Sequence, residues 1–433
     1  MVYNFKVLLV FFIALFSVFF LRAQDTTLTL NRTELETLFL KNNLSLLAEN
    51  LSISKAEAKI IQAKVWPNPT LSIEDVNLWR PKSIGNEELI PPLVGNFGRN
   101  QQFSIGFEQL IITAGKRKKL IELKKMGLEY SKQYFEEILR NLKVEFRNAL
   151  NEMNYLQHYK SVYKSQLHSI NQLKESYKNQ VDKGFLNKGE FIRLKTISLE
   201  VQHELNQLES KYESIEHDIK LLINVPIQTT IQLKEEGMKV DKAELISLDV
   251  QELIDSAKVY RPELQLSKIE EEMAHQTLSI ARAERVPDLS VLGNYNRGDG
   301  LYPDYIGFGI AFDIPVFNRN KGNIQHANIE IQHAKINQER TAKSIEKEIV
   351  IAISQYKKAI DFVQHIEEDY EAELDQILDA YTHSFTNQNI SIIEYLDFLE
   401  AYLENKRIIL QSEYNLREKA EELNYAIGID LIK

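Results

Sequence analysis

The chain has 433 residues, of which 44% are hydrophobic and 26% are charged, so it is long enough to bury a large core. It contains no cysteine, which excludes disulfides, thiol catalysis, thiolate metal sites and an acylated N-terminal cysteine. Its formal net charge of -10 disfavours a surface that binds nucleic acid. Only 16 Gly and 10 Pro interrupt the sequence, so we expect long helices.

The N-terminus has the features of a secretory signal peptide. Lys6 precedes an apolar run at 7–21, and the small residue Ala23 stands just before polar sequence. This order predicts a signal peptide over residues 1–23, cleaved after Ala23. The alternative is a retained membrane anchor, because the run approaches the minimum length of a membrane span. No later segment is apolar enough to be a transmembrane helix.

The rest of the chain follows one plan twice. A polar helical segment ends at Pro67 and again at Pro287, and a strand-like alternation follows each proline. Each copy continues with a second strand, a very long helical region, a short break and another helix. Three pairs of residues lie 204 positions apart, namely Tyr177 and Tyr381, Glu190 and Glu394, and Asn224 and Gly428. We assign the first repeat to 24–225, a connector to 226–260 and the second repeat to 261–433.

The long helices have the spacing of a coiled coil. No proline occurs from Lys116 to about Val181, which predicts a rod of about 100 Å. Apolar residues in both copies step by 4 and 3, which is typical of a coiled-coil seam. They are Phe135, Leu139, Leu142, Phe146, Ala149, Met153 and Leu156, and Ile345, Ile349, Ala352, Tyr356, Ala359, Val363 and Ile366. An extended soluble coiled coil would explain these helices, but not the strands.

The predicted strands at 102–110 and 306–317 have one apolar face and one small or polar face. In the second of them, Ile306 and Phe308 alternate with Gly307 and Gly309. This pattern suits a strand between lipid and water. A half-buried soluble sheet has the same pattern, but the signal peptide and the long helices favour the membrane. Four strands are too few to close a barrel around water, so we expect a barrel shared with other copies.

The order and spacing of the signal peptide, strands and helices resemble those of the TolC-like outer-membrane efflux proteins. The resemblance covers roughly Asp25 to Lys433. The resemblance rests on the helix-proline-strand junctions "VWPNPTLSIE" and "RVPDLSVLGNYN", and on the strand exits "FEQLIITAGKRKK" and "FDIPVFNRNKGN". No single motif is highly specific, whereas their order and spacing are.

The resemblance implies a mainly α fold with a membrane β-barrel and an internal tandem repeat. In such proteins three identical chains each give four strands to one 12-stranded barrel, and their helices form a long periplasmic coiled-coil tunnel. It also implies a location in the outer membrane and the role of exit channel in a tripartite efflux system. The partners would be a periplasmic adaptor and an inner-membrane transporter of the RND type or similar. No cofactor, no metal and no catalytic activity are expected.

The stretch "SIIEYLDFLEA" resembles the acidic end of the family's second helical hairpin, with Glu394 and Asp397 in the matching positions. These residues lie at i and i+3, hence on one helix face. In a trimer they would place six carboxylates around the periplasmic aperture, where they would attract cations and at least some would titrate at higher pH than a free side chain. A solvated helix face is the alternative, since Glu400 and Glu404 continue the acidity. Ile390 stands where relatives of the best-known type carry a basic residue.

The breaks between the helices, at Lys183 to Glu190 and Thr386 to Ile393, are predicted to dock the adaptor. Both interrupt otherwise continuous helices and carry small or polar residues. We expect a bulky side chain at Gly184 to abolish export without affecting trimer assembly. The predicted docking residues are Gly184, Asn187, Gly189, Asn387 and Asn389.

Two other classes of protein remain open at this point. One is a secreted trimeric coiled-coil adhesin or scaffold without a channel, and the other is an enzyme with helical insertions. His326 and His333 share a helix face, but no zinc-binding His-Glu-x-x-His pattern is present. Aromatic residues near strand ends, among them Tyr295, Tyr302, Tyr305 and Trp79, suggest an interfacial belt, with packing in turns as the alternative.

Overall fold

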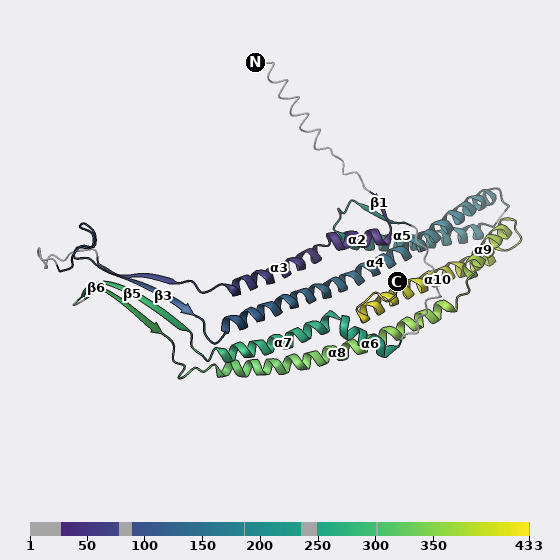
Figure 1. The fold of residues 1–433 in the computed structure, drawn as a ribbon. Coiled ribbons are helices and arrows are strands. Elements are labelled where there is room, and N and C mark those ends of the chain that lie inside the picture. Colours follow the sequence, from purple (N-terminus) through teal and green to yellow (C-terminus); the bar gives the residue numbers. More distant parts are fainter. Residues whose placement is uncertain (1–26, 78–88, 186, 235–248, 300–301, 433) are drawn as a thin grey trace, which may run out of the picture. The chain divides into compact units, whose positions relative to one another are not determined.

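The structure is a computed structural model that describes residues 27–77, 89–185, 187–234, 249–299 and 302–432 (Figure 1). The predicted signal peptide, Trp79 and positions 235–248 of the connector lie outside these ranges. The chain divides into two compact units, and each takes segments from both halves of the sequence. Unit 1 comprises Met1–Ala48, Ile138–Tyr260 and Ile345–Lys433, and unit 2 comprises Glu49–Glu137 and Arg261–Ser344. The repeat boundaries therefore stay a prediction about the sequence.

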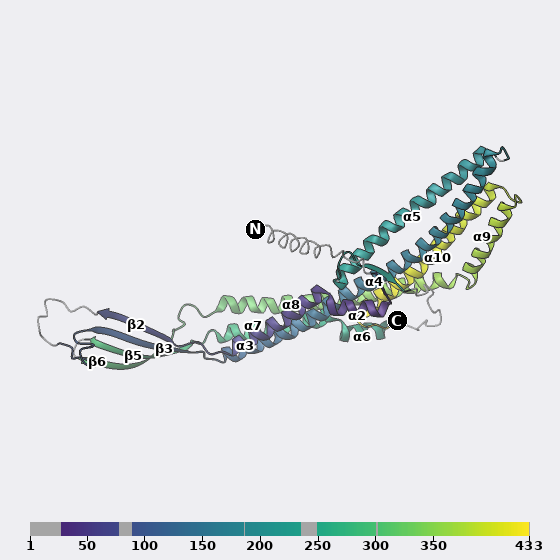
Figure 2. The same cartoon turned by 90° about the horizontal axis from the view of Figure 1, so that it is seen from above.

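Unit 2 contains a four-stranded antiparallel sheet. Its strands are β2 (Thr70–Asn77), β3 (Gln102–Ile111), β5 (Leu289–Asp299) and β6 (Tyr302–Ala311), in the order β2-β3-β5-β6. Figure 2 shows the four strands side by side. Among the described strands, β2 pairs only with β3 and β6 only with β5, so the sheet has two open edges. Each half of the sequence contributes one hairpin, as predicted.

The two faces of this sheet differ sharply. Directly paired residues share a face, and one cross-strand row consists of Leu71, Phe107, Gly293 and Phe308. The next row on that face consists of Ile73, Ile105, Tyr295 and Ile306. Phe308 is 87% exposed, and Leu71, Ile73 and Ile306 are also exposed. The opposite face carries the row Ser72, Gly106, Asn294 and Gly307. The predicted division into an apolar face and a small or polar face is therefore present across all four strands.

The predicted second-copy strand differs in its bounds from β6. We expected it over 306–317, but the strand begins at Tyr302 and ends at Ala311. The residues after Ala311 keep the apolar alternation as far as Ile314, yet Pro315 has no backbone N–H to donate to a ladder. Alternation alone therefore misplaced the end of the strand.

The helix-to-strand junctions lie at the two predicted prolines. The helix α3 (Leu44–Lys64) ends three residues before Pro67, and α7 (Pro262–Ala283) ends shortly before Pro287. The two halves are joined here: the Thr113 hydroxyl donates to the Pro287 carbonyl at 2.6 Å and the Thr113 N–H donates to Asp288 Oδ1 at 2.8 Å. The buried Lys116 ammonium lies 3.0 Å from the same carboxylate.

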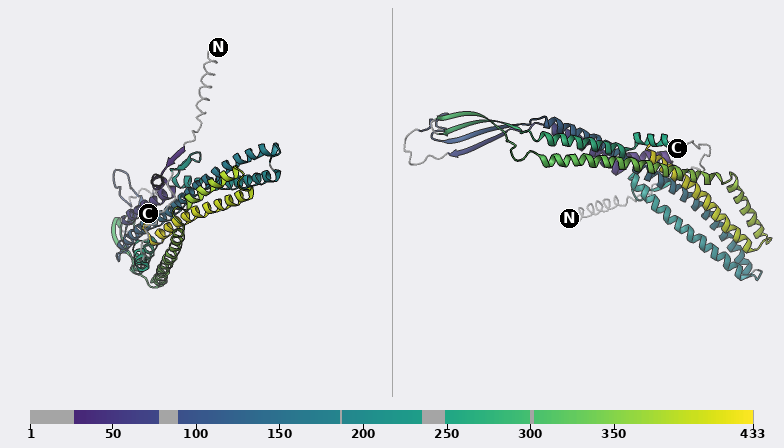
Figure 3. Two further views of the ribbon diagram at one scale, coloured as in Figure 1. Left: turned by 90° about the vertical axis from the view of Figure 1, so that its right-hand side faces the viewer. Right: turned by 90° about the horizontal axis from the view of Figure 1, so that it is seen from below.

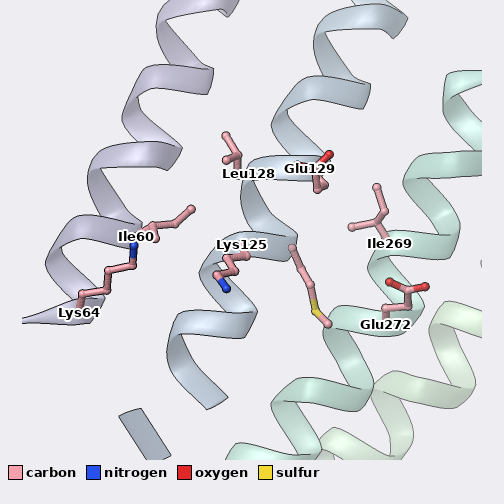
Figure 4. A pocket seen from close by; sticks show the side chains of 8 residues that line it. Ile60, Lys64, Lys125, Leu128, Glu129, Ile269 and Glu272 are labelled. Carbon is pink, nitrogen blue, oxygen red and sulfur yellow. The ribbon is translucent and has the colours of Figure 1, made fainter. Parts of the chain in front are cut away.

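Four helices of unit 2 precede or follow its strands in the chain. They are α3, α7, the beginning of α4 (Lys116–Asp182) and the beginning of α8 (Lys321–Gln364). The buried side chains of Leu278, Ala327 and Ile331 pack α7 against α8. A groove of about 510 Å³ lies among α3, α4 and α7 (Figure 4). Its walls are formed by Ile60, Lys64, Lys125, Met126, Leu128, Glu129, Ile269 and Glu272.

Unit 1 is built from helices around an aromatic-rich core. Its remaining helices are α2 (Arg32–Asn42), α5 (Lys188–Ile223), α6 (Val250–Tyr260), α9 (Tyr370–Thr386) and α10 (Ile392–Ile427). One continuous cluster joins α4, α5, α9 and α10, with Ile170, Leu194, Phe385, Tyr395 and Leu399 among its most buried members. The strands β1 (Thr27–Leu30) and β4 (Thr230–Leu233) form a separate parallel pair.

The predicted coiled-coil seam is confirmed in the second copy. Six of its seven residues are buried, namely Ile345, Ile349, Ala352, Tyr356, Ala359 and Val363. In the first copy Phe146, Met153 and Leu156 are buried, and the other four seam residues are half-buried. The first long helix covers Lys116–Asp182, in agreement with its prediction.

The second long helical region is interrupted once more than we expected. The helix α8 ends at Gln364, and α9 begins at Tyr370. Glu367, Glu368 and Asp369 fill the gap directly before α9. Acidic side chains stabilise the N-terminus of a helix and destabilise its C-terminus, so this run favours starting a new helix over continuing the old one.

Over the residues that the structure describes, none of the helices has both the length and the apolar character needed to cross a membrane.

Candidate functional site: the helical tips and the acidic start of α10

The first predicted docking tip is the turn between α4 and α5. Gly184 stands just past α4 with φ +80°, in the left-handed region. Its N–H donates to the Val181 carbonyl, and the Phe185 N–H donates to the Gln180 carbonyl at 2.9 Å. This pair of hydrogen bonds is the Schellman motif that ends many helices. Gly184 therefore has a conformational role in addition to its exposure.

A predicted test at this tip needs correction. We expected a bulky side chain at Gly184 to report on docking alone. A residue other than glycine in the left-handed region costs about 1 kcal/mol, so a tryptophan there would also strain the turn. The neighbouring Phe185 is the better reporter, because its side chain is 76% exposed. Sequence reasoning included Phe185 in the tip without singling it out, although an aromatic residue in a polar turn was the available signal.

The second tip repeats the geometry of the first with a different sequence. Gln388 has φ +59°, and the Asn389 N–H donates to the Ser384 carbonyl at 2.8 Å. Gln388 and Ser384 lie 204 positions after Gly184 and Gln180. The offset predicted from Tyr177 and Tyr381 therefore holds for individual backbone hydrogen bonds.

The remaining predicted tip residues begin or end helices. Asn187 precedes α5, and its side-chain oxygen accepts from the Gly189 N–H at 2.8 Å. Asn387 follows α9, and its N–H donates to the His383 carbonyl at 3.0 Å. All of the predicted docking residues are exposed. The structure thus presents them at the surface and also gives most of them a part in the turns.

Stacked aromatic rings join the two tips. The Tyr177 ring of α4 stacks on the Phe385 ring of α9 at 5.2 Å between centroids. Phe385 also stacks on Tyr395 of α10 at 4.8 Å. Figure 3 shows the α4–α5 hairpin and the α9–α10 hairpin ending next to each other. The two predicted tips therefore form one surface. The Phe385 ring lies beneath it and is only 1% exposed.

Glu394 and Asp397 lie in the first turns of α10, and both are exposed. Glu394 forms a capping box with Ser391: its carboxylate accepts from the Ser391 N–H at 2.8 Å, and the Ser391 hydroxyl accepts from the Glu394 N–H. The hydrogen bond from the Ser391 backbone, assisted by that from its hydroxyl, lowers the pKa of Glu394. We expected some aperture carboxylates to titrate higher than usual. In the single chain Glu394 shifts the other way, so a raised pKa there requires charges from neighbouring copies.

The acidity farther along α10 is organised differently. The Glu404 carboxylate accepts from Arg407 Nε at 2.8 Å, three residues later on the same helix. Glu400 is exposed and lies one turn before Glu404. Glu404 is therefore part of a local ion pair, whereas Glu394 caps the helix.

The described part of the chain offers no cluster of side chains for a metal ion. Within it, no group of three or more His, Asp or Glu side chains is arranged to hold a metal ion. His333 is exposed and lies 3.7 Å from the Glu330 carboxylate, so its neighbourhood is that of a surface residue.

Comparison with known proteins connects this architecture to one family. Residues 253–429 match the model of the family described as outer membrane efflux protein. A comparison of the sequence with curated proteins found no match.

Solved structures share the fold along nearly the whole chain. CusC, whose structures concern folding and transmembrane channel formation, superposes with a TM-score of 0.71 at 17% identity, covering 95% of this chain and 96% of CusC. The outer membrane protein VceC of Vibrio cholerae gives 0.69 at 17% identity, with 92% and 97% covered. The CmeC outer membrane channel of Campylobacter jejuni gives 0.71 at 16% identity, with 93% and 87% covered. The chain therefore matches the outer membrane efflux protein family over residues 253–429, and its fold is that of these outer-membrane proteins.

Proposed function

We propose that the chain is the outer-membrane exit channel of a tripartite efflux system. It passes substrates, delivered by a periplasmic adaptor and an inner-membrane transporter, to the exterior. The observation that carries this proposal is the four-stranded sheet, whose apolar face is exposed across all four strands. Exposing such a face to water is unfavourable by about 25 cal/mol per Å², whereas lipid accommodates it.

The two open edges of the sheet support a homotrimer. A strand in lipid cannot leave its backbone groups unpaired, because each unsatisfied group costs several kcal/mol. Pairing β2 of one copy with β6 of the next satisfies both edges and turns three sheets into one closed barrel. The small and polar face then lines the lumen, as suits a water-filled channel.

Exposed apolar side chains on the helices of unit 2 favour the same assembly. Leu51 and Ile61 of α3, and Ile329 and Ile336 of α8, are each more than half exposed in the single chain. In a trimer, neighbouring copies would cover these residues and remove their apolar surface from water. The groove among α3, α4 and α7 belongs to the same unit.

The comparisons give no support to a secreted adhesin or scaffold, the alternative left open by the sequence. The proposed channel acts by positioning and passage and needs no catalytic group. Its tips at 183–190 and 386–393 would dock the adaptor, and Glu394 and Asp397 would surround the periplasmic aperture.

The decisive experiment joins the open edges covalently. Because the chain has no cysteine, Ser72→Cys on β2 and Gly309→Cys on β6 introduce the only thiols. A Cβ at Gly309 meets only Leu292 at 3.8 Å, an ordinary contact. Treating intact cells with a short bismaleimide should give a covalent trimer in the outer-membrane fraction.

The matched control keeps Ser72→Cys and moves the second thiol to Asn294→Cys on the central strand β5. The two positions belong to one cross-strand row within one sheet, so cross-linking should leave the chain monomeric in denaturing gels. A soluble protein, or equal cross-linking by both variants, would refute the shared barrel.

A further inference from the structure

The segment 89–101, which precedes β3, folds over one end of the sheet. Its carbonyls at Pro91 and Gly98 accept hydrogen bonds from the Arg297 guanidinium of β5, at 3.1 Å in the case of Gly98. The other terminal nitrogen of Arg297 lies 2.6 Å from the Asp304 carboxylate of β6. Arg297 is 1% exposed, which makes it the largest fully buried side chain of the described residues. It fastens the segment to the sheet.

The strand register shows which face this segment covers. Arg297 pairs with Phe103 and Asp304, and it lies two residues after Tyr295. Alternate residues of a strand share a face, and the Phe103 and Tyr295 rings are in contact at 6.0 Å. Arg297 therefore projects from the apolar face. The segment lies on the side that faces lipid under the proposed function, at the end of the sheet away from the helices.

Two glycines permit this close approach. A Cβ added at Gly298 would lie 2.6 Å from Ile90 Cδ1, and one at Gly98 would lie 3.0 Å from Arg297 Nε. Both glycines have φ above +80°, where other residues are strained. The segment and β5 are thus fitted to each other.

The segment pairs several of its polar groups internally and exposes four large apolar side chains, together with Asn96 and Arg99. Asn100 Oδ1 accepts from the N–H groups of Leu89 and Ile90, each at 3.0 Å. Gln101 Oε1 accepts from the Gly98 N–H at 3.0 Å. Among the apolar side chains, Val94 is 78% exposed and Phe97 is 60% exposed. Leu89 and Leu93 are exposed as well.

Exposing four large apolar side chains in so short a segment is unfavourable for a loop in water. A segment surrounded by water gains nothing from exposing large apolar side chains, whereas a segment in lipid must pair its backbone groups internally. A buried arginine is tolerated in such a place because Asp304 compensates its charge and the two carbonyls take its remaining donors.

We propose that the segment 89–101 is a lipid-contacting anchor that inserts Leu89, Leu93, Val94 and Phe97 among acyl chains of the outer leaflet. Arg297 acts as the positioning residue that holds it there. This inference rests on the proposed function, because it needs the apolar face of the sheet to lie in the membrane. The apolar surface of the sheet and that of the segment form one continuous lipid contact.

Spin labels at single cysteines test the inference in the full-length protein reconstituted in phospholipid vesicles. The variants are Val94→Cys in the anchor, Phe308→Cys on the apolar face of β6, and Lys183→Cys at the helical tip. For each label, collisions with oxygen, which concentrates in lipid, are compared with collisions with a water-soluble nickel complex. We expect oxygen to dominate at Val94 and Phe308, and nickel to dominate at Lys183.

The three positions separate the inference from the proposed function. Nickel dominance at Val94 with oxygen dominance at Phe308 would overturn the anchor and leave the membrane sheet standing. Nickel dominance at both would overturn the membrane sheet and the anchor together.

A second pair of variants tests the role of Arg297. Arg297→Lys in the Val94→Cys background keeps the charge but cannot reach two carbonyls and a carboxylate at once. The Val94 label should become more mobile and shift toward nickel accessibility. Arg297→Lys combined with Phe308→Cys should leave the Phe308 label unchanged. An unaltered Val94 spectrum would remove Arg297 from the proposal.

Discussion

The Arg147 guanidinium is the centre of a charged cluster that closes the C-terminal end of unit 1. It lies 2.9 Å from the Glu36 carboxylate, 3.2 Å from Glu421 and 2.8 Å from Asp430. Lys143 adds a second cation at 2.6 Å from Asp430. The cluster thereby ties α2, α4 and the residues after α10 together, although these elements are far apart in the sequence.

Asp430 gives this cluster a defined pH dependence. Burial acts to raise the pKa of Asp430, but hydrogen bonds from Arg147 and Lys143 outweigh it, so that the pKa is lowered. A carboxyl with a lowered folded-state pKa stabilises the fold above its unfolded pKa, and loses this contribution as pH falls through the folded value. Protonation of Asp430 in acid should therefore loosen the C-terminus.

We predict that Asp430→Asn lowers the stability of the trimer at about pH 7 and reduces its further loss at about pH 3. The carboxylate is 44% exposed, so the effect near neutrality should be at most about 1 kcal/mol after solvent screening. Apparent melting temperatures from circular dichroism measure it. Asp379→Asn, at an exposed position of α9, is the control, and an equal change in both variants would contradict the prediction.

At the residue scale, the structure gives some of the predicted site residues additional roles. Glu394 was identified as an acidic aperture residue by resemblance, yet its hydrogen bonds show that it also caps α10. The pattern Ser-x-x-Glu at 391–394 is a capping signature, so this role was accessible from sequence. The burial of Arg297 was not accessible, because it depends on a segment that folds back over the sheet from about 200 residues earlier.

At the scale of elements, the α9–α10 hairpin depends on one buried lysine. The Lys406 ammonium of α10 lies 2.9 Å from Glu371 and 3.0 Å from Asp375 of α9, and only 4% of the residue is exposed. Tyr402 donates to the same Asp375 carboxylate at 2.8 Å. The two carboxylates are partly exposed, whereas the ammonium is not.

This difference in burial predicts that replacing the lysine lowers the free energy of unfolding less than replacing its two carboxylates. Lys406→Met should cost about 1 kcal/mol or less, because an apolar side chain fits the buried site and the carboxylates regain water. Glu371→Gln with Asp375→Asn should cost about 3 kcal/mol, because it leaves a buried ammonium without a countercharge. Thermal unfolding of the two variants measures the difference. Glu339→Gln, in an exposed pair with Lys343, should have almost no effect, and the reverse order of costs would be inconsistent with a buried lysine.

The paired tips make a prediction for docking. Phe185→Asp places a charge at the most exposed aromatic position of the first tip without disturbing Gly184. We expect trimers to assemble normally but to lose cross-linking to the periplasmic adaptor, because an exposed aromatic residue at the centre of a contact contributes strongly to binding. Thr196→Asp, exposed on α5 farther from the turn, is the matched control. Retained cross-linking in Phe185→Asp would place the adaptor elsewhere.

Element boundaries show where local rules suffice and where they fail. The prolines at 67 and 287 marked both helix-to-strand junctions, because proline cannot continue a helix. The break between α8 and α9 was missed, since it carries no proline or glycine and depends on three adjacent acidic residues. Apolar alternation located β6 but extended it beyond Ala311, where its pairing with β5 ends.

At the scale of the molecule, the two compact units each combine distant parts of the sequence. The cluster in unit 1 packs Ile170 and Leu194 of the first half with Leu399 and Leu403 of the second. Hydrophobic periodicity indicates which face of a helix is buried but not which partner buries it. The repeat at an offset of 204 was readable from sequence, whereas the interleaving of its copies required the structure.

The last prediction concerns the aperture that three copies would form. Asp397 is exposed and lies three residues after Glu394 on α10. Unlike Glu394, it takes no part in the capping box, so its substitution leaves the helix cap intact. If the residue surrounds a narrow pore, Asp397→Asn removes three carboxylates from the constriction while keeping side-chain size. Purified trimers in planar bilayers should then lose much of their cation preference, because a ring of like charges sets the local cation concentration.

Two variants of the same helix make the measurement specific. Glu400→Gln removes as many charges one turn farther from the tip and avoids Glu404, whose loss would leave Arg407 without its partner. Ser391→Ala keeps every acidic charge but breaks the capping box, at a cost of about 1 kcal/mol. If Asp397 acts through its charge at the constriction, Asp397→Asn should alter selectivity more than either. An equal change in Glu400→Gln would indicate a diffuse acidic surface, and an equal change in Ser391→Ala would assign the effect to the geometry of the α10 N-terminus.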